Sequence, residues 1–526
     1  MEIETVGYRG KNITNPTTVV LQTTEAPQID PSIPEYYHRH WQVSNETASH
    51  RFPPARDEDH PITLKPGAPN TLDCKIYRQM EIELQTTKDF IRDELAKGYI
   101  EESNSPYMSP LFYWAKKDGK LRPIMDYKAL NSWTVRDTYP LPLISNIIDH
   151  LQGKTLFTKF NIRWGYNNIQ IKEDRWKAAF KTPFRLYQPK VMYFGLTNLP
   201  PTFCHAMAKM FCKLLLKYPD NLFVYMDDVL NAMDGNLDLH RLIVDLVLDL
   251  YAWESYFLQP SQCAWEQTQI EYLGLIVDGD NLTIDPKKAD GLCYWPRTLN
   301  TVKEVQGILG VLGYQHPFIQ NYANIAFPLV NLTRKDHSFV WTPECRTTLD
   351  TLINIILNNP SLHQPNLNKP FFLQVDASAF TTGAILTQKD DRGKHVAVGF
   401  HSQTFNDAER NYDIHNQELL AVYRGLTHNH HLLLSSPHPI TVYTNHKNLE
   451  YYRKPQSINC HVAQYLPHLA DYNFQLVHVP GTTNKADALS RRPDYDDSST
   501  DSSNIIVLPP QLFINTTTFS SIDDRA

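Results

Sequence analysis

The stretch LFVYMDDVL (residues 222–230) decides the fold, because it places two adjacent carboxylates between two short apolar runs. The runs Leu222-Phe223-Val224 and Val229-Leu230 favour β-strands, so the polar residues between them predict a tight turn. At such a turn Asp227 and Asp228 repel each other unless cations lie between them or one pKa is raised. A lone pair of aspartates is more often a solvated turn, but apolar strands on both sides favour a buried, metal-binding pair.

Charge is distributed unevenly around this stretch. The chain of 526 residues holds 50 Lys+Arg and 57 Asp+Glu, and its net charge of 50 − 57 = −7 does not by itself indicate a nucleic-acid-binding protein. Residues 116–217 hold 18 basic and 6 acidic side chains (18 − 6 = +12), and residues 218–286 hold 1 and 13 (1 − 13 = −12). A basic segment with interspersed aromatic residues beside an acidic one favours a groove for nucleic-acid phosphates next to a cation site. Two solvated surfaces of opposite sign are the alternative.

Composition excludes several classes of protein. Hydrophobic residues make up 42% of the chain, which is enough for buried cores and excludes a disordered or fibrous chain. The seven cysteines never show the spacing C-x-x-C, so neither a disulfide framework nor a cysteine zinc site is expected. No stretch reaches about 18 apolar residues. We therefore expect a soluble, intracellular protein that is not secreted and has no membrane partner.

Apolar periodicity predicts the main elements. Apolar residues recur at three- and four-residue steps from Met80 to Gly98, which predicts a helix that ends at the glycine. Lys117-Asp118-Gly119-Lys120, between apolar runs, predicts a β-hairpin. Residues 301–335 have helical spacing, whereas residues 353–370 are rich in Asn and Pro and predict a linker. Beyond the linker we expect strands at 371–375 and 384–388 and a helix at 418–426.

Five motifs together resemble a known family. In chain order they are WAKKDGKLRPIMDYKALN (114–131), FTKFNIRWGYNNIQI (157–171), FGLTNLPPTF (194–203), YMDD (225–228) and EYLGLIVDGD (271–280). They resemble the reverse transcriptase of gypsy-type long-terminal-repeat retrotransposons, the Metaviridae group. The resemblance runs from about Arg51 to Pro493, and the motifs follow the family order.

The resemblance implies an α+β multidomain fold, in which a right-hand polymerase of fingers, palm and thumb is followed by an RNase H-like mixed α/β domain. The expected division is an extended N-terminal arm (1–60), fingers and palm (61–290), a thumb-like helical subdomain (291–352), a linker (353–370), an RNase H-like domain (371–493) and an acidic, disordered tail (494–526).

The resemblance also assigns roles at the polymerase site. Asp227 and Asp228 match catalytic carboxylates that bind two Mg²⁺ ions, with Mn²⁺ as an alternative. Lys116 and Arg122 match residues that hold the incoming deoxynucleoside triphosphate, a task suited to lysine's point charge and arginine's planar fork. Tyr166 matches the bulky side chain that excludes a 2′-hydroxyl beneath the nucleotide sugar; an ordinary core tyrosine is the alternative. The turn Tyr272-Leu273-Gly274 matches the turn near the primer end.

One position departs from the family at the centre of this site. Asn161 stands where the family has the first catalytic Asp, so this site loses one negative charge. At about 4 Å and an effective dielectric near 20, a charge pair is worth roughly 4 kcal/mol, so the loss costs on the order of a thousandfold in rate. We therefore predict that polymerisation is severely impaired.

A second set of acids follows the linker. Asp376 at a strand end, Glu418 on a helix and Asp487 resemble three of the four carboxylates with which the RNase H domain binds two metal ions. The family directs water at the RNA strand of an RNA–DNA hybrid with this set. Asn445, in VYTNHKNLEYY, stands where the family has the remaining Asp, so we predict slow hydrolysis. Taken one at a time, each acid is more often a surface residue.

The expected partners are an RNA template, a DNA primer, an RNA–DNA hybrid and deoxynucleoside triphosphates, and the oligomeric state is left open. The expected location is the cytoplasm, with virus-like particles or the nucleus as alternatives. No protease motif or integrase zinc pattern is found, so we expect a polyprotein fragment or a separate product. The two Asp-to-Asn changes suggest a decayed genomic copy. The alternative function is a catalytically dead remnant that at most binds template–primer, and a chain whose fold is no longer stable is a third hypothesis.

Overall fold

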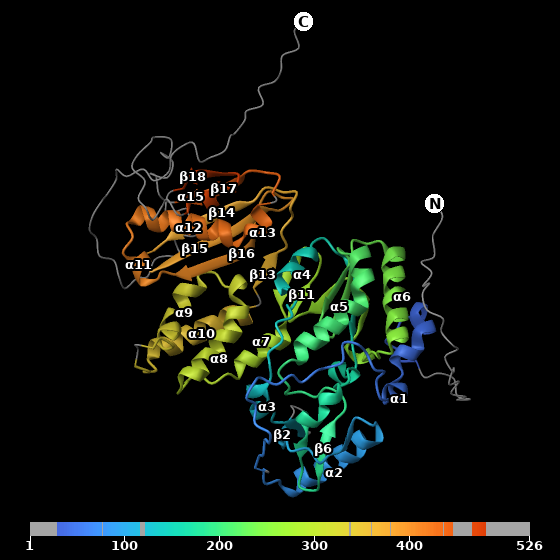
Figure 1. Cartoon of the computed structure of the whole chain (residues 1–526). Coiled ribbons are helices and arrows are strands. Elements are labelled where there is room, and N and C mark those ends of the chain that lie inside the picture. Colours follow the sequence, from blue (N-terminus) through green and yellow to red (C-terminus); the bar gives the residue numbers. More distant parts are fainter. Residues whose placement is uncertain are drawn as a thin grey trace.

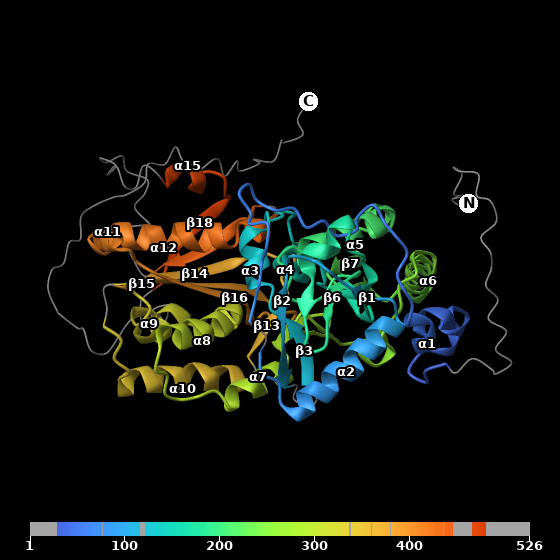
Figure 2. The same cartoon turned by 60° about the horizontal axis from the view of Figure 1, so that its bottom comes forward.

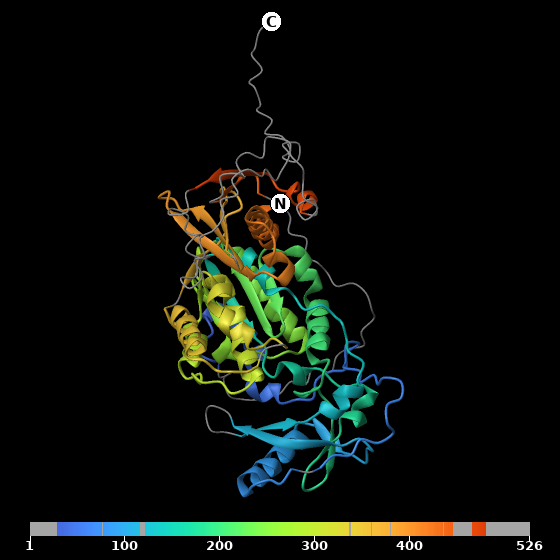
Figure 3. The same ribbon diagram turned by 90° about the vertical axis from the view of Figure 1, so that its left-hand side faces the viewer.

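The computed structural model describes residues 29–444, apart from short gaps at 76, 116–120, 336–337, 359, 379 and 435, together with residues 465–479. Within these residues there are four β-sheets of four or five strands, and the first two interleave along the chain, because strand β4 of the second precedes strands β5 and β6 of the first. Figure 1 shows the sequence of layers, from the blue and cyan fingers-like region through the green palm-like and yellow helical regions to the orange C-terminal sheet. The same layers are seen from the side in Figure 3.

The first sheet forms the fingers-like region and has the strand order β1-β6-β5-β2-β3. Its strands are β1 (Ile100–Glu102), β2 (Ser109–Ala115), β3 (Leu121–Met125), β5 (Phe180–Lys181) and β6 (Leu186–Pro189). The helix expected from Met80 is α2 (Glu81–Ala96), and Gly98 at φ 73° turns the chain after it. The strands of the expected hairpin, β2 and β3, pair antiparallel, whereas the turn that joins them lies outside the described residues.

The second sheet forms the palm-like region and has the order β7-β8-β4-β9. Its strands are β4 (Leu156–Asn161), β7 (Leu222–Tyr225), β8 (Asp228–Met233) and β9 (Ala264–Gln267). The helices α5 (Leu199–Lys217) and α6 (Leu237–Glu254) pack against it with fully buried rings. Tyr251 of α6 meets Phe160 of β4 and Phe211 of α5 edge to face, with ring centroids 6.0 and 5.7 Å apart. These contacts hold β4, the strand that pairs with the aspartate-bearing strand β8.

Shorter elements connect these two sheets. They are α3 (Lys128–Trp133), α4 (Ile144–His150), η2 (Gly165–Asn168), η3 (Glu173–Ala178) and η4 (Pro260–Gln262).

The expectation of an extended arm over residues 1–60 is wrong for its second half. The segment instead forms the helices η1 (Glu35–Ser44) and α1 (Glu46–Ser49), and η1 packs against α6. Tyr37 is only 1% exposed, its ring lies 5.3 Å from that of Trp265, and its hydroxyl donates to Glu266 at 2.8 Å. The segment lacks apolar periodicity, but one buried aromatic residue with a distant polar partner anchors it.

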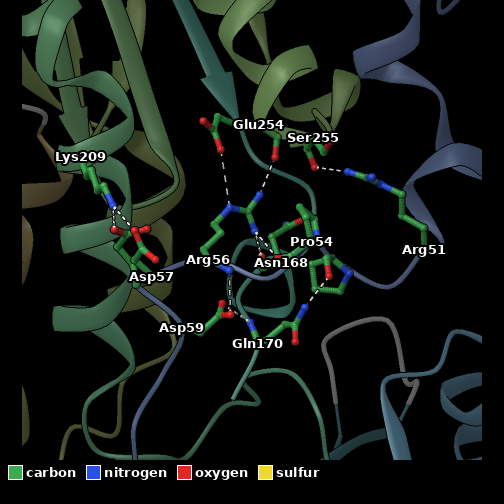
Figure 4. A network of polar contacts seen from close by, with 12 residues as sticks. Arg51, Pro54, Arg56, Asp57, Asp59, Asn168, Gln170, Lys209, Glu254 and Ser255 are labelled. Atoms are coloured by element: carbon green, nitrogen blue, oxygen red, sulfur yellow. Dashed lines mark hydrogen bonds and ion pairs between the residues drawn. The ribbon is translucent and has the colours of Figure 1, made fainter. Parts of the chain in front are cut away.

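Residues 51–60 continue as a strap across the palm-like region, which Figure 4 shows from close by. The guanidinium of Arg56 donates to the carbonyl oxygen of Asn168 at 2.7 Å and also to that of Glu254. Asp59 accepts the backbone N–H of Arg56 at 2.8 Å and that of Gln170 at 3.2 Å. Arg56 thereby supplies hydrogen-bond donors to two half-buried carbonyl groups at the ends of η2 and α6.

The third sheet shares one hydrophobic core with the helical region. Its order is β10-β11-β12-β13, with β10 (Ile270–Tyr272), β11 (Leu275–Val277), β12 (Asn281–Ile284) and β13 (Ser361–His363). The helices are α7 (Pro286–Cys293), α8 (Val302–Tyr314), η5 (His316–Phe318), α9 (Tyr322–Asn331) and α10 (Pro343–Leu357).

Two expected boundaries therefore differ from the structure. The core joins β10–β12 to α8–α10, so the division at residue 291 does not separate two cores. The expected linker, 353–370, contains the last turn of α10 and the strand β13, which pairs with β12. Asn and Pro in this stretch mark a tight connection between two ordered elements rather than a free linker.

The fourth sheet has the order β16-β15-β14-β17-β18. Its strands are β14 (Phe372–Ala377), β15 (Thr381–Lys389), β16 (His395–Thr404), β17 (Ile440–Thr444) and β18 (Phe474–His478). The helices beside it are α11 (Asp407–Arg410), α12 (Ile414–His428), α13 (His430–Leu433) and α15 (Leu466–Leu469). Figure 2 shows α12 lying along this sheet. Gly425 allows the close approach, because a Cβ there would lie 3.1 Å from the side chains of Leu373 and Val375.

Candidate active sites

The expected turn between two strands is the β-hairpin of β7 and β8. Tyr225 pairs directly with Asp228, so Met226 and Asp227 form a two-residue turn. Met226 takes a left-handed backbone conformation with φ 55°, which a two-residue hairpin turn requires. The sequence prediction of two strands around a polar turn is confirmed.

Asn161 lies directly beside this turn at the end of β4. It is the cross-strand partner of Asp228, and its side-chain Nδ2 donates to Oδ1 of Asp228 at 3.3 Å. The backbone N–H of Ile162 donates to the carbonyl oxygen of Asp227, also at 3.3 Å. The structure thus brings Asn161 together with the two aspartates, as the resemblance implies, and its neutral amide donates to one carboxylate of the pair.

The two aspartates are partly buried, and burial affects the ionisation of Asp227. Burial raises the pKa of Asp227, and the neighbouring charge of Asp228 raises it further. The amide of Asn161 and the ammonium of Lys159 oppose this rise because they favour the charged carboxylate. The site therefore holds its negative charge with the help of hydrogen bonds from the protein.

Two cysteines support the hairpin and the end of β4, and neither was predicted as a site residue. The Sγ of Cys263 accepts the backbone N–H of Asn161 at 3.4 Å, and burial raises the pKa of its thiol to about 11. The Sγ of Cys204 lies 3.3 Å from Sδ of Met226. Both thiols act as small packing groups behind the turn.

Tyr166 lies close to the aspartates inside an aromatic cluster. Its ring meets the rings of Phe194 and Phe203 edge to face, with centroids 5.1 and 5.6 Å away. Burial raises its pKa to about 12, and the charge of Asp227 adds to the rise. A Cβ on the preceding Gly165 would lie 3.5 Å from Cβ of Asp227, so this glycine lets the Tyr166 loop approach the turn.

The two expected triphosphate ligands are only partly located. Arg122 of β3 is exposed, and its Cζ lies 4.3 Å from the centroid of the Phe194 ring, which also contacts Tyr166. This places Arg122 at the fingers side of the aromatic cluster. Lys116 lies outside the described residues.

The turn Tyr272-Leu273-Gly274 is held by hydrogen bonds from two other elements, β4 and α8. Leu273 and Gly274 have left-handed backbones, with φ 53° and 82°. The ammonium of Lys159, two residues before Asn161 on β4, donates to the carbonyl oxygen of Glu271 at 3.0 Å. The hydroxyl of Tyr314, the last residue of α8, donates to the carbonyl oxygen of Leu273 at 2.7 Å.

Tyr314 was not expected from the sequence. Burial raises its pKa, and Tyr225 of the aspartate hairpin adds to this rise, so the side chain lies near both turns. It thus connects the helical region to the hairpin that carries the aspartates.

The second candidate site lies in the fourth sheet. Asp376 near the end of β14 is fully buried and pairs with Gly383 of β15, and Glu418 of α12 is 3% exposed. Oε2 of Glu418 accepts the hydroxyl of Thr444, the last residue of β17, at 3.5 Å. The expected elements therefore carry these two acids, whereas Asn445 and Asp487 lie outside the described residues.

Among the described residues, no group of three or more His, Cys, Asp or Glu side chains is arranged to hold a metal ion. No helix in the same part of the chain is long and apolar enough to cross a membrane.

Comparison with known proteins identifies both regions. A family model described as reverse transcriptase (RNA-dependent DNA polymerase) matches residues 114–277, and one described as an RNase H-like domain found in reverse transcriptase matches residues 341–442. The chain is therefore, by family, a reverse transcriptase joined to an RNase H-like domain. Both matches include the aspartates described above, Asp227 and Asp228 in the first and Asp376 in the second.

Relatives of this chain include transposon polyproteins. The Transposon Tf2-3 polyprotein of Schizosaccharomyces pombe is 29% identical over 470 residues, which cover 88% of this chain and 35% of that polyprotein. The Transposon Tf2-7 polyprotein of the same organism is 28% identical over the same shares. This chain is therefore similar to one part of these transposon polyproteins, and it spans about a third of their length.

Solved structures share the fold. A foamy viral protease-reverse transcriptase in complex with dsDNA matches with a TM-score of 0.69 and 19% identity, over 84% of this chain and 92% of that one. The same type of enzyme in complex with an RNA/DNA hybrid matches with a TM-score of 0.66 and 18% identity, over 90% and 62%. The expected α+β architecture, a polymerase followed by an RNase H-like domain, is thereby confirmed.

Proposed function

We propose that this chain binds template–primer as a retrotransposon reverse transcriptase, and that its DNA synthesis is strongly impaired at Asn161. The observation that carries the proposal is the hydrogen bond from the Asn161 amide to Asp228. It puts a neutral donor where the resemblance implies a third anion, and the donor faces one of the two remaining carboxylates.

Nucleic-acid binding is supported by charge and by the related structures. The segment 116–217 carries 18 − 6 = +12, and it includes the exposed Arg122 beside the aromatic cluster of Tyr166. Such a surface binds backbone phosphates in a salt-dependent way. The foamy viral enzymes with the same fold are complexes with dsDNA and with an RNA/DNA hybrid.

Divalent cations are general in both families, and the proposed cofactor here is Mg²⁺. The described donors do not fit a centre for two cations. Asp227 and Asp228 offer two carboxylates, but the third group offers an amide that points its hydrogen at Asp228. An amide oxygen is a weaker ligand than a carboxylate, and two dications need more negative charge than two carboxylates supply.

The other residues of the site are proposed to position the substrates. Tyr166 forms a wall next to Asp227, held by Phe194 and Phe203, where it contacts the sugar of an incoming deoxynucleoside triphosphate. Arg122 binds the triphosphate from the fingers side, together with Lys116. Positioning alone lowers the reaction barrier substantially, so a chain with an intact wall still binds substrates in order.

For the C-terminal region we propose weak cleavage of the RNA strand in RNA–DNA hybrids. The support is the burial of Asp376 and Glu418 in the expected elements, β14 and α12. Asn445 removes one proposed carboxylate, so hydrolysis is expected to be slow. Asn445→Asp is expected to raise the rate of hybrid cleavage, and equal rates for the native chain and the variant would refute this assignment.

Primer extension with the purified chain tests the polymerase proposal. The native chain is expected to bind template–primer with salt-dependent affinity, as measured by fluorescence anisotropy, and to extend it far more slowly than the Asn161→Asp variant. Equal extension rates in Mg²⁺ would show that Asn161 does not limit synthesis.

A second candidate function is binding without turnover. The same Asn161–Asp228 bond favours it, because it stabilises the carboxylate pair without a cation. Binding that persists in EDTA, with no extension above background even in Mn²⁺, would favour this function. Absence of salt-dependent binding would exclude both.

A further inference from the structure

Three histidine rings meet where the helical region contacts the fourth sheet. His316 belongs to η5, His401 to β16 and His428 to the last turn of α12. The rings of His401 and His428 stack with centroids 3.9 Å apart and planes 18° apart. The ring of His316 lies 5.8 Å from that of His401. We call these three residues the histidine junction.

Ser402 of β16 fixes the protonation state of this junction. Its backbone N–H donates to Nε2 of His316 at 3.3 Å, and its Oγ lies 3.4 Å from the same nitrogen. That Oγ also accepts the backbone N–H of Ala323 in α9 at 2.9 Å. A nitrogen that accepts an N–H bond needs its lone pair, so His316 is neutral while the two regions are docked. A proton on Nε2 breaks the contact.

The contact between the helical region and the fourth sheet also covers the outer edge of that sheet. β16 is the outer strand of its sheet, and Ala397 and Phe400 on it pack against the core of the helical region. An outer strand presents unpaired N–H groups, and His316 satisfies that of Ser402. The histidine contact therefore belongs to a real interface between the two regions.

The surroundings disfavour a positive charge on the rings. Burial, together with the ring of His428, lowers the pKa of His316 to about 4. Burial also lowers the pKa of His401 to about 3, and His428, His316 and Arg424 add to this effect. Burial likewise lowers the pKa of His428, to which His431 adds.

The remaining groups that face the junction do not compensate a charge on it. Arg424 of α12 is already paired with Glu409, with nitrogen–oxygen distances of 2.9 and 2.8 Å. The ring of Tyr322 in α9 lies 5.0 Å from His316 and is uncharged, because burial raises its pKa. No carboxylate among the described residues is within ion-pair distance of the three rings.

A second histidine contact, between the fourth-sheet region and helix α4, responds to pH in the opposite direction. Nε2 of His431 in α13 lies 3.3 Å from Oδ2 of Asp149 in α4. The hydrogen bond to Asp149 raises the pKa of His431, so acid strengthens this contact.

We propose that the histidine junction is an acid-sensitive latch. Protonation of its rings releases the RNase H-like region from the helical region, while the contact between His431 and Asp149 remains and acts as a pivot. Release exposes the outer edge of β16.

The direction and size of the pH effect on docking follow from the linkage between docking and proton binding by His316. A free histidine has a pKa near 6.5, and docking lowers that of His316 to about 4, so docking is strongest above pH 6.5 and weakens as the pH falls toward 4. At pH 5 the ratio of protonated to neutral His316 is about 30:1 in the released state and only about 1:10 in the docked state. The docking equilibrium therefore weakens about thirtyfold between pH 8 and pH 5 from His316 alone.

Small-angle X-ray scattering on the full chain at pH 8 and pH 5 tests the latch. The radius of gyration of the native chain is expected to rise at pH 5, while its far-ultraviolet circular dichroism stays unchanged. The variant H316Q/H401F/H428F keeps a hydrogen-bond acceptor and the ring stacking but cannot titrate, so it is expected to stay compact. Asp149→Asn is expected to enlarge the expansion at pH 5, because the pivot is weakened.

His205→Gln is the matched control, because His205 is an exposed histidine of α5 that stacks on Tyr139, away from the junction. This control is expected to expand like the native chain. A native radius that is equal at both pH values overturns the proposal, as does equal expansion of the native chain and the triple variant. If the triple variant does not fold, the single variant His316→Gln replaces it and is expected to show a smaller expansion than the native chain.

Discussion

The side-chain nitrogen of Asn161 lies 3.3 Å from a carboxylate oxygen of Asp228, and the two residues are direct partners across strands β4 and β8. A carboxylate at position 161 would face Asp228 at the same distance and repel it. The amide instead donates a hydrogen bond to it, so the site needs no cation to keep the strand ends together. This difference gives Asn161 opposite effects on catalysis and on stability.

The effect on catalysis is tested with Asn161→Asp. Restoring the carboxylate is expected to raise the rate of primer extension in Mg²⁺ by on the order of a thousandfold, because a charge pair at about 4 Å is worth roughly 4 kcal/mol at an effective dielectric near 20. Single-turnover extension at saturating nucleotide measures this rate. Asp227→Asn in the same background is the control and is expected to abolish the gain.

The effect on stability runs the other way. In EDTA, Asn161→Asp is expected to lower the melting temperature by a few degrees, because it exchanges a hydrogen bond for repulsion between partly buried carboxylates. Mg²⁺ is expected to raise the melting temperature of the variant more than that of the native chain. Asn70→Asp adds the same charge at an exposed loop position and is expected to change neither value. A variant that is as stable as the native chain in EDTA would contradict this explanation.

The sequence predicted local features better than long-range ones. The β7–β8 hairpin and α2 follow from apolar spacing within a few residues, and the structure has both. The packing of Tyr37 on Trp265 joins residues more than two hundred positions apart, and no local sequence pattern predicts such a contact. The same holds for the candidate site: Asp227, Asp228 and Asn161 were recognisable by motif, whereas Tyr314 reaches Leu273 from a different element.

The strap over residues 51–60 depends on Arg56. Its side chain is 9% exposed, and it donates to carbonyl groups of Asn168 and Glu254. Arg56→Ala leaves these acceptors without a partner and is expected to cost about 2–3 kcal/mol of unfolding free energy, measured by urea denaturation. Arg92→Ala removes an arginine that is 71% exposed and forms only surface ion pairs, so it is expected to cost less than about 1 kcal/mol. Equal losses would show that the strap contributes no specific stability.

Buried neutral histidines in the palm-like region give a pH dependence of stability. His60 is 2% exposed with Nδ1 2.9 Å from the hydroxyl of Thr202, and His240 is fully buried with Nε2 2.7 Å from the hydroxyl of Thr158. Burial lowers the pKa of each to about 4. Their contribution is complete above the unfolded value near 6.5 and is lost as the pH falls toward 4.

The expected loss is about 2 kcal/mol per ring between pH 8 and pH 5. Urea denaturation at the two pH values measures it. His60→Gln is expected to reduce the difference between them, even if it lowers stability at both, and His205→Gln is expected to leave the difference unchanged. A difference that is the same in all three chains would assign the acid sensitivity to other groups.

The hydrogen bond from Tyr314 to the carbonyl oxygen of Leu273, 2.7 Å long, is the contact through which α8 holds the turn next to the aspartate hairpin. Tyr314→Phe removes only the hydroxyl and is expected to weaken template–primer binding about three- to tenfold, since one such bond is worth roughly 0.5–1.5 kcal/mol. The dissociation rate, measured by anisotropy, is expected to rise, and the melting temperature to stay within about 1 °C. Tyr294→Phe is the matched control, because Tyr294 is 90% exposed and lies at the end of α7. Unchanged dissociation in Tyr314→Phe would mean that the helical region does not position this turn.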